Sequence, residues 1–108
     1  MSTEAKQVTG GTGNPLPYVV VRTRSAGAFA GWMKRYRAGE VELLQSRRIW
    51  YWAGAATLSQ LAQEGTSRPD LCKFPVAVDR QLLPEVIEVL FATEQARLSI
   101  EGVPVWKA

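Results

Sequence analysis

Residues 18–24 read Tyr18-Val19-Val20-Val21-Arg22-Thr23-Arg24, and this stretch decides the fold class. Aromatic and β-branched side chains of this kind fit the pleated, half-buried surface of a strand. The turn-forming run Ser25-Ala26-Gly27 follows directly, and residues 29–37 again alternate like a strand. A strand that leads through a tight turn into another strand predicts antiparallel pairing.

Four more short strands are expected further along the chain. Breaks in the pattern fall at Gln45-Ser46 and at Asp79-Arg80-Gln81. The strands between the breaks are predicted over residues 41–44, 47–52, 74–78 and 85–91.

Two short helices complete the pattern. Thr57 with Gln60 forms a capping box before a helix that Gly65 ends. Thr93 begins a second helix, which ends at Gly102. The sequence therefore predicts a mainly β (α+β) fold, a compact antiparallel sheet or partly open small barrel of about six short strands with two short helices.

The chain is expected to form one domain with a tail. Residues 1–15 are predicted to be a flexible N-terminal tail, because the run of Gly, Thr and Asn at 9–14 is polar and has no periodicity. Residues 16–108 then make a single β-rich domain of ordinary size. No apolar run approaches the roughly 20 residues of a membrane span, and the start of the chain lacks the apolar segment of a signal peptide.

Composition argues against an enzyme. The chain contains no histidine, and Cys72 is its single cysteine. Ser–His and Cys–His dyads, histidine metal sites and Cys-rich zinc sites are therefore excluded. We expect no catalytic residues, no metal site and no cofactor. An unpaired thiol also fits a reducing cytoplasm.

Positive charge is concentrated in the first half of the domain. Residues 18–52 carry seven Lys or Arg against Glu40 and Glu42, whereas residues 53–108 carry five basic against seven acidic residues. A field of this sign attracts anionic ligands.

The block Arg47-Arg48-Ile49-Trp50-Tyr51-Trp52 points to the chemistry of such a ligand. Guanidinium groups grip phosphate and aromatic rings stack on bases. Candidate ligand-binding residues are therefore the basic and aromatic side chains of this block and of the first strand: Arg22, Arg24, Arg47, Arg48, Trp50, Tyr51 and Trp52.

Strand alternation allows two registers for these residues. If Val19, Val21, Ile49 and Tyr51 face the core, the outer surface is an exposed platform formed by Arg22, Arg24, Arg48, Trp50 and Trp52. The opposite register buries two tryptophans, and an oligomer interface satisfies both arrangements. The plainer interpretations are that the tryptophans pack in a core or interface and that the arginines pair with carboxylates on a solvated face.

Three blocks of the chain resemble a known group of proteins. They are VRTRSAG at 21–27, RRIWYWxGAAxLSQLAxEG at 47–65, and the ending with VIEV at 86–89, Thr93-Glu94 and VPVW at 103–106. They are similar to small uncharacterised proteins encoded by tailed phages and prophages, over nearly all of residues 18–106. The resemblance implies the cytoplasm of an infected or lysogenic bacterial host and supplies no catalytic residues.

Three classes of function follow from these observations. The leading hypothesis is a non-enzymatic, homo-oligomeric protein that sequesters a nucleotide-derived anionic small ligand, acting as a sponge for a host-defence signal. The second is a single-stranded nucleic-acid-binding module that uses the same basic, aromatic surface. The third is a protein-interaction or structural phage module in which the tryptophans anchor a partner.

Overall fold

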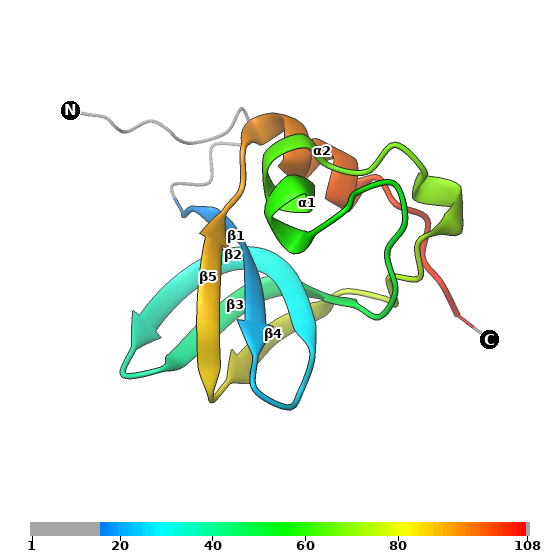
Figure 1. The fold of residues 1–108 in the computed structure, drawn as a ribbon. Coiled ribbons are helices and arrows are strands. Elements are labelled where there is room, and N and C mark those ends of the chain that lie inside the picture. Colours follow the sequence, from blue (N-terminus) through cyan, green and yellow to red (C-terminus); the bar gives the residue numbers. More distant parts are fainter. Residues whose placement is uncertain (1–15, 108) are drawn as a thin grey trace.

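The computed structural model describes residues 16–107, which form one antiparallel sheet with helices over one side (Figure 1). The helices are α1 (Leu58–Glu64), α2 (Glu94–Glu101) and the short 3₁₀ helix η2 (Pro69–Leu71). The predicted tail, residues 1–15, lies outside the described residues, as does residue 108. The predicted class, a mainly β fold with two α-helices, is confirmed. The strands are β1 (Tyr18–Thr23), β2 (Ala28–Arg37), β3 (Glu40–Ile49), β4 (Val78–Leu83) and β5 (Val86–Phe91).

The strands β4 and β5 are neighbours in the chain and yet lie at opposite ends of the strand order β4-β3-β2-β1-β5. Pro84 and Glu85 form the whole connection between them. Since so short a link spans no more than about 10 Å, the sheet must curl until its two edges meet at this end. Val86 N–H donates to Gly39 O and Arg24 N–H donates to Glu85 O, both at 2.9 Å, and these bonds hold the curl.

Curling gives the sheet two buried faces. The concave face is filled by apolar side chains from β1 to β4, and the convex face packs under Leu61 of α1 and Ile100 of α2. β1 lies between the two cores, so Val19, Val20 and Val21 are all fully buried. A strand covered on both faces needs an unbroken apolar run instead of an alternating one.

The two helices begin and end where the sequence predicts. Thr57 Oγ1 accepts a hydrogen bond from Gln60 N–H at 3.1 Å, and Thr93 Oγ1 accepts one from Ala96 N–H at 3.0 Å. Gly65 ends α1 with φ at 80°, and a Cβ there would collide with Ser99 of α2. Glycine therefore allows both the helix end and the close approach of the helices.

The strand β3 joins two strands that the sequence predicted separately, over residues 41–44 and 47–52. The break at Gln45 is a bulge: this residue has φ at 51°, and the register against β2 shifts opposite it. A bulge accommodates an extra residue without ending the strand. β3 ends at Ile49, so residues 50–52 lie beyond it.

The strand β4 occupies the place where a turn was predicted, and the predicted strand at 74–78 is mostly loop. Its polar side chains find partners on β3 instead of in a turn. Gln45 Nε2 donates to Asp79 at 3.1 Å, and Ser46 Oγ donates to Gln81 at 2.8 Å. An edge strand that is stabilised by such cross-strand bonds can be as polar as a turn, and its sequence therefore predicted a turn.

A buried carboxylate joins three adjacent strands. Glu42 of β3 is 1% exposed because two arginines cover it. Arg35 Nη2 of β2 donates to Oε1 at 2.6 Å, and Arg80 Nε of β4 donates to Oε2. The bond from Arg80, with that from Arg35, holds the pKa of Glu42 below its ordinary value of 4.5, although burial opposes this shift.

The variant Glu42→Gln is expected to lower the Tm at neutral pH and to flatten the acid dependence of stability. Because the pKa of Glu42 is depressed in the folded chain, its ionised form stabilises the fold at neutral pH, and this contribution is lost as pH falls through the folded value. Thermal unfolding between about pH 7 and pH 3 measures both effects. Glu40→Gln, at an exposed carboxylate of the same strand, is the control. If the Tm of Glu42→Gln fell with pH in parallel with the Tm of wild type, the lowered pKa of Glu42 would be contradicted.

Candidate functional site

The structure separates the seven predicted ligand-binding residues. Arg22 lies on β1 and bonds Glu88 of β5 at 3.1 Å. Arg24 is exposed where β1 meets the turn, and its side chain makes no hydrogen bond or ion pair with residues 16–107 that the structure resolves. Arg48 donates to Ala26 O at 2.8 Å and stacks over the Phe29 ring at 4.5 Å. The predicted platform assumed that one strand continues through residues 47–52. Because β3 ends at Ile49, strand alternation does not place Trp50 and Trp52 on one face with these arginines.

Arg47 lies inside the domain, 6% exposed. Its Nη1 donates to Ile100 O at 2.9 Å, Nη2 to Phe74 O at 3.1 Å and Nε to Pro75 O at 3.3 Å. Burial lowers the pKa of this guanidinium, and the nearby Tyr18 opposes that shift. The side chain joins β3 to the loop at 74–75 and to the end of α2, so it faces no ligand surface.

Trp52 is half-buried and serves the core. Its Nε1 donates to Ala55 O at 3.0 Å, and its ring packs against the convex core. The adjacent Gly54, with φ at 81°, has no room for a Cβ because the backbone of Ser67 and Arg68 approaches it. The segment after β3 is therefore a tightly packed turn, and the hydrogen bond and packing of Trp52 help to stabilise it.

Trp50 and Tyr51, in contrast, are exposed and meet two residues from other parts of the chain. The Trp50 and Trp106 rings are parallel within 8°, with centroids 6.5 Å apart. The Lys73 ammonium lies 5.9 Å from the Tyr51 ring and 5.6 Å from the Trp106 ring. We call Trp50, Tyr51, Lys73 and Trp106 the aromatic platform.

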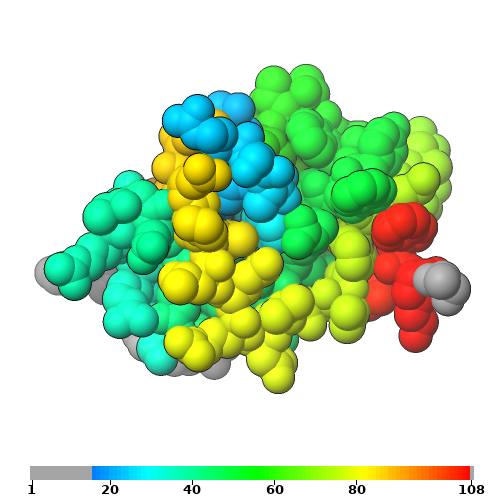
Figure 2. Space-filling model, turned by 90° about the horizontal axis from the view of Figure 1, so that it is seen from below, coloured from blue at the N-terminus to red at the C-terminus, as the bar shows by residue number. Residues whose placement is uncertain are grey.

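Backbone bonds position the platform. Tyr51 and Lys73 exchange two hydrogen bonds, at 3.3 and 2.8 Å, and Trp106 N–H donates to Phe74 O at 3.0 Å. Figure 2 shows the C-terminal segment lying against the chain at about residues 70–76, far from the β2–β3 hairpin. Sequence reasoning missed Lys73 and Trp106 as members of this surface, because no spacing or motif links three segments so distant in the chain.

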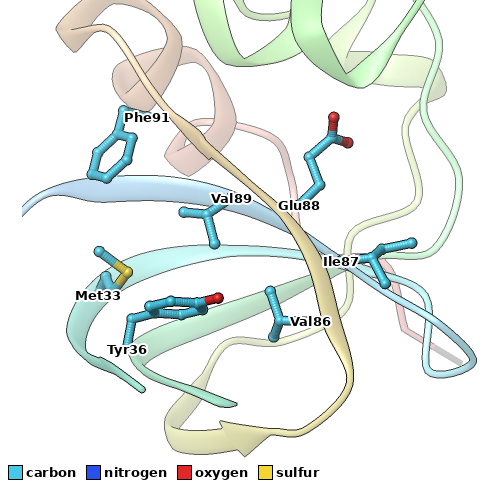
Figure 3. Close-up of a pocket in the computed structure, with 7 residues that line it drawn as sticks. All are labelled: Met33, Tyr36, Val86, Ile87, Glu88, Val89 and Phe91. Carbon is cyan, nitrogen blue, oxygen red and sulfur yellow. The ribbon is translucent and has the colours of Figure 1, made fainter. Parts of the chain in front are cut away.

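A second exposed apolar surface is a groove of about 300 Å³ between β5 and the end of β2. Its walls are Met33 and Tyr36 of β2 with Val86, Val89 and Phe91 of β5, and Figure 3 shows these five side chains around one space. The groove exists because β1 pairs with β2 no further than Trp32, which leaves the rest of β2 uncovered on that side. We call it the apolar groove.

The described part of the chain, residues 16–107, holds no group of three or more Cys, Asp and Glu side chains arranged to bind a metal ion. It also contains no helix with the length and apolarity to cross a membrane. Cys72 is buried, and its thiol lies 3.5 Å from Ala53 O.

Residues 16–100 match the model of a family described as a domain of unknown function (DUF6948), and the chain belongs to this family. No curated protein and no solved structure matches the chain. Family membership therefore brings no activity or ligand with it, and the site has to be interpreted from its own chemistry.

The variant Arg47→Met is expected to destabilise the fold by about 2–4 kcal/mol, because three backbone carbonyls lose their charged donor. Urea unfolding measures the change. Arg24→Met, at the exposed end of β1, is the matched control and should stay within about 0.5 kcal/mol of wild type. Equal stability of the two variants would show that Arg47 has no structural role.

Proposed function

We propose that this protein is a non-enzymatic binding module that holds single-stranded nucleic acid on the aromatic platform. The observation that carries the proposal is the parallel, exposed Trp50–Trp106 ring pair with the Lys73 ammonium beside it. Single-stranded nucleic acid combines flat bases with phosphate charge, and proteins bind it with stacking rings and cations.

The rings supply the base contact. A base can extend the Trp50–Trp106 stack on its open side, and stacking of this kind is worth about 1–3 kcal/mol per base. Tyr51 offers a third exposed ring on the same platform, tied to Lys73 through the backbone. Every base has a π-face, so the surface would bind with little sequence preference.

The lysines supply the phosphate contact. Lys73 is held at the ring edges by its interactions with Tyr51 and Trp106, which places a cation beside the stacking surface. Lys107 is exposed directly after Trp106. The arginines contribute little here, since Arg47 and Arg48 both give hydrogen bonds to backbone carbonyls.

The open shape of the platform favours a strand over a sequestered small nucleotide. A sponge needs a pocket that covers most of its ligand. The apolar groove is a hollow of about 300 Å³, but its lining includes no Lys or Arg that could contact a phosphate. The small-ligand hypothesis therefore needs a further chain to enclose the platform, whereas a strand can lie across it. A cytoplasmic location in a phage-infected bacterium is the setting in which we expect this binding.

Fluorescence anisotropy with a labelled oligo-dT tests the proposal. Trp50→Ala and Tyr51→Ala are each expected to weaken binding about 5- to 150-fold, which corresponds to the loss of one stacked base. Leu82→Ala is the control and should leave binding unchanged, because Leu82 is 58% exposed on β4, outside both the aromatic platform and the apolar groove. Circular dichroism confirms that each variant is folded.

The salt dependence of the same titration tests the phosphate contact. Lys73→Gln should reduce the slope of log K against log salt by about 0.7, the value for one phosphate of a single strand. Lys34→Gln, at an exposed lysine of β2, should leave the slope unchanged. No binding of oligo-dT at low salt, or equal affinity for Trp50→Ala and wild type, would contradict the proposal.

A thermal-shift panel separates the remaining hypotheses. A rise in Tm with one cyclic nucleotide or ADP-ribose derivative, little affected by salt, would favour sequestration. No change in Tm with either the nucleotides or DNA would favour a protein partner anchored by Trp50 and Trp106.

A further inference from the structure

The sheet has two edge strands that differ in how they are protected. β4 carries Asp79, Arg80 and Gln81 along its edge. β5 reads Val-Ile-Glu-Val-Leu-Phe, and its one charged residue, Glu88, is neutralised by Arg22 of β1 at 3.1 Å. Charged side chains on an edge prevent pairing with other chains, and an uncharged apolar edge permits it. Of the two edges, β5 is the unprotected one.

The open backbone of β5 is a short segment centred on Val89. Ala92 N–H donates to Tyr18 O of β1 at 2.9 Å, so antiparallel alternation turns the N–H and C=O of Val89 away from β1. Both ends of the segment are occupied. Val86 N–H donates to Gly39 O, and Phe91 O accepts from Gln63 Nε2 at 3.3 Å. Between these two ends, a few residues of β5 remain available for backbone hydrogen bonds with another strand.

The apolar groove lies directly beside this segment. Val86, Val89 and Phe91 face it, and Ile87 and Glu88 also border it, although their side chains are directed outward (Figure 3). The Phe91 ring stands at one end of the groove and is 58% exposed. The same surface therefore presents an unfilled apolar hollow and an uncovered apolar ring.

We propose that the groove and the β5 edge bind a second copy of this chain, with the two β5 strands antiparallel across a two-fold axis at Val89. In this register the partner subunit's Phe91 lies opposite Ile87. Phe91 shares its face of the strand with Val89, which faces the groove, so the partner's ring lies on the groove side near Val86 and Tyr36, whereas the irregular register of β5 turns Ile87 outward. Each copy thus supplies the ring that fills the other's groove. A two-fold contact uses the same patch on both copies, as most homo-oligomers do.

The charges of the edge suit a contact between identical surfaces. Like charges directly opposite one another destabilise a strand pair. In the proposed register, however, Glu88 lies opposite the partner subunit's Leu90, and each Glu88 keeps its own Arg22. The paired β5 strands therefore place no like charges opposite one another, and the residues at the two-fold axis are apolar.

Sedimentation velocity over a concentration series of the full chain tests the dimer. Wild type is expected to reach twice the 11.9 kDa mass of one chain. Phe91→Glu places a carboxylate in each groove and should weaken dimerisation at least about 10-fold. Leu82→Glu is the matched control, since Leu82 lies on the other edge strand with the same 58% exposure, and it should stay dimeric.

Hydrogen exchange gives a second measurement on the unmodified protein. The Val89 amide should exchange more slowly at high than at low protein concentration, because dimerisation gives it an acceptor. A wild-type chain that stays monomeric, a dimer that survives Phe91→Glu, or a dimer that dissociates in Trp50→Ala instead would each overturn the proposal. These measurements contain no nucleic acid, so their outcome is independent of the proposed function.

Discussion

The two-residue connection between β4 and β5 is the constraint on which the rest of the structure depends. It forces the outermost strands of the sheet together at one end, so the sheet curls and acquires an inside. The curl encloses one core, and the helices cover a second core on the opposite face. β1 lies between them, which accounts for its unbroken apolar sequence. Because β2 extends past the end of β1, the curl also leaves the apolar groove open along β5.

Several arginines hold this architecture together. Arg35 and Arg80 cover the carboxylate of Glu42 across three strands. Arg97 is buried between Glu94 and Glu101 and lies over the Trp32 ring at 5.2 Å, so it fastens α2 to the convex core. The bond to Glu94 raises the pKa of Arg97 and keeps it ionised. The basic character of the sequence is therefore partly structural, and the charge available to a ligand is smaller than composition suggests.

The two exposed apolar surfaces arise in different ways and suit different tasks. The aromatic platform is assembled from loop segments that pair through isolated backbone bridges, and it combines rings with a cation. The apolar groove belongs to the sheet itself and combines apolar side chains with open backbone groups. Rings beside an ammonium match nucleotides, whereas an open strand edge matches another strand. A dimer formed through β5 would present two aromatic platforms. Two linked platforms that contact the same nucleic-acid strand bind it more tightly than one platform does.

The sequence by itself determined the class of the fold and both α-helices with their caps, because these depend on local propensity and on periodicity. Tertiary structure decided the rest. The bulge at Gln45 and the polar strand β4 were missed since their backbone is stabilised by cross-strand partners that no local pattern reveals. The same holds for the candidate site: Trp50 and Tyr51 of the predicted set lie on the aromatic platform, whereas folding placed Arg47 and Trp52 in other surroundings and brought Lys73 and Trp106 to the platform. Local signals identify elements and their residues, whereas which side chains meet at a surface depends on contacts between segments far apart in the chain.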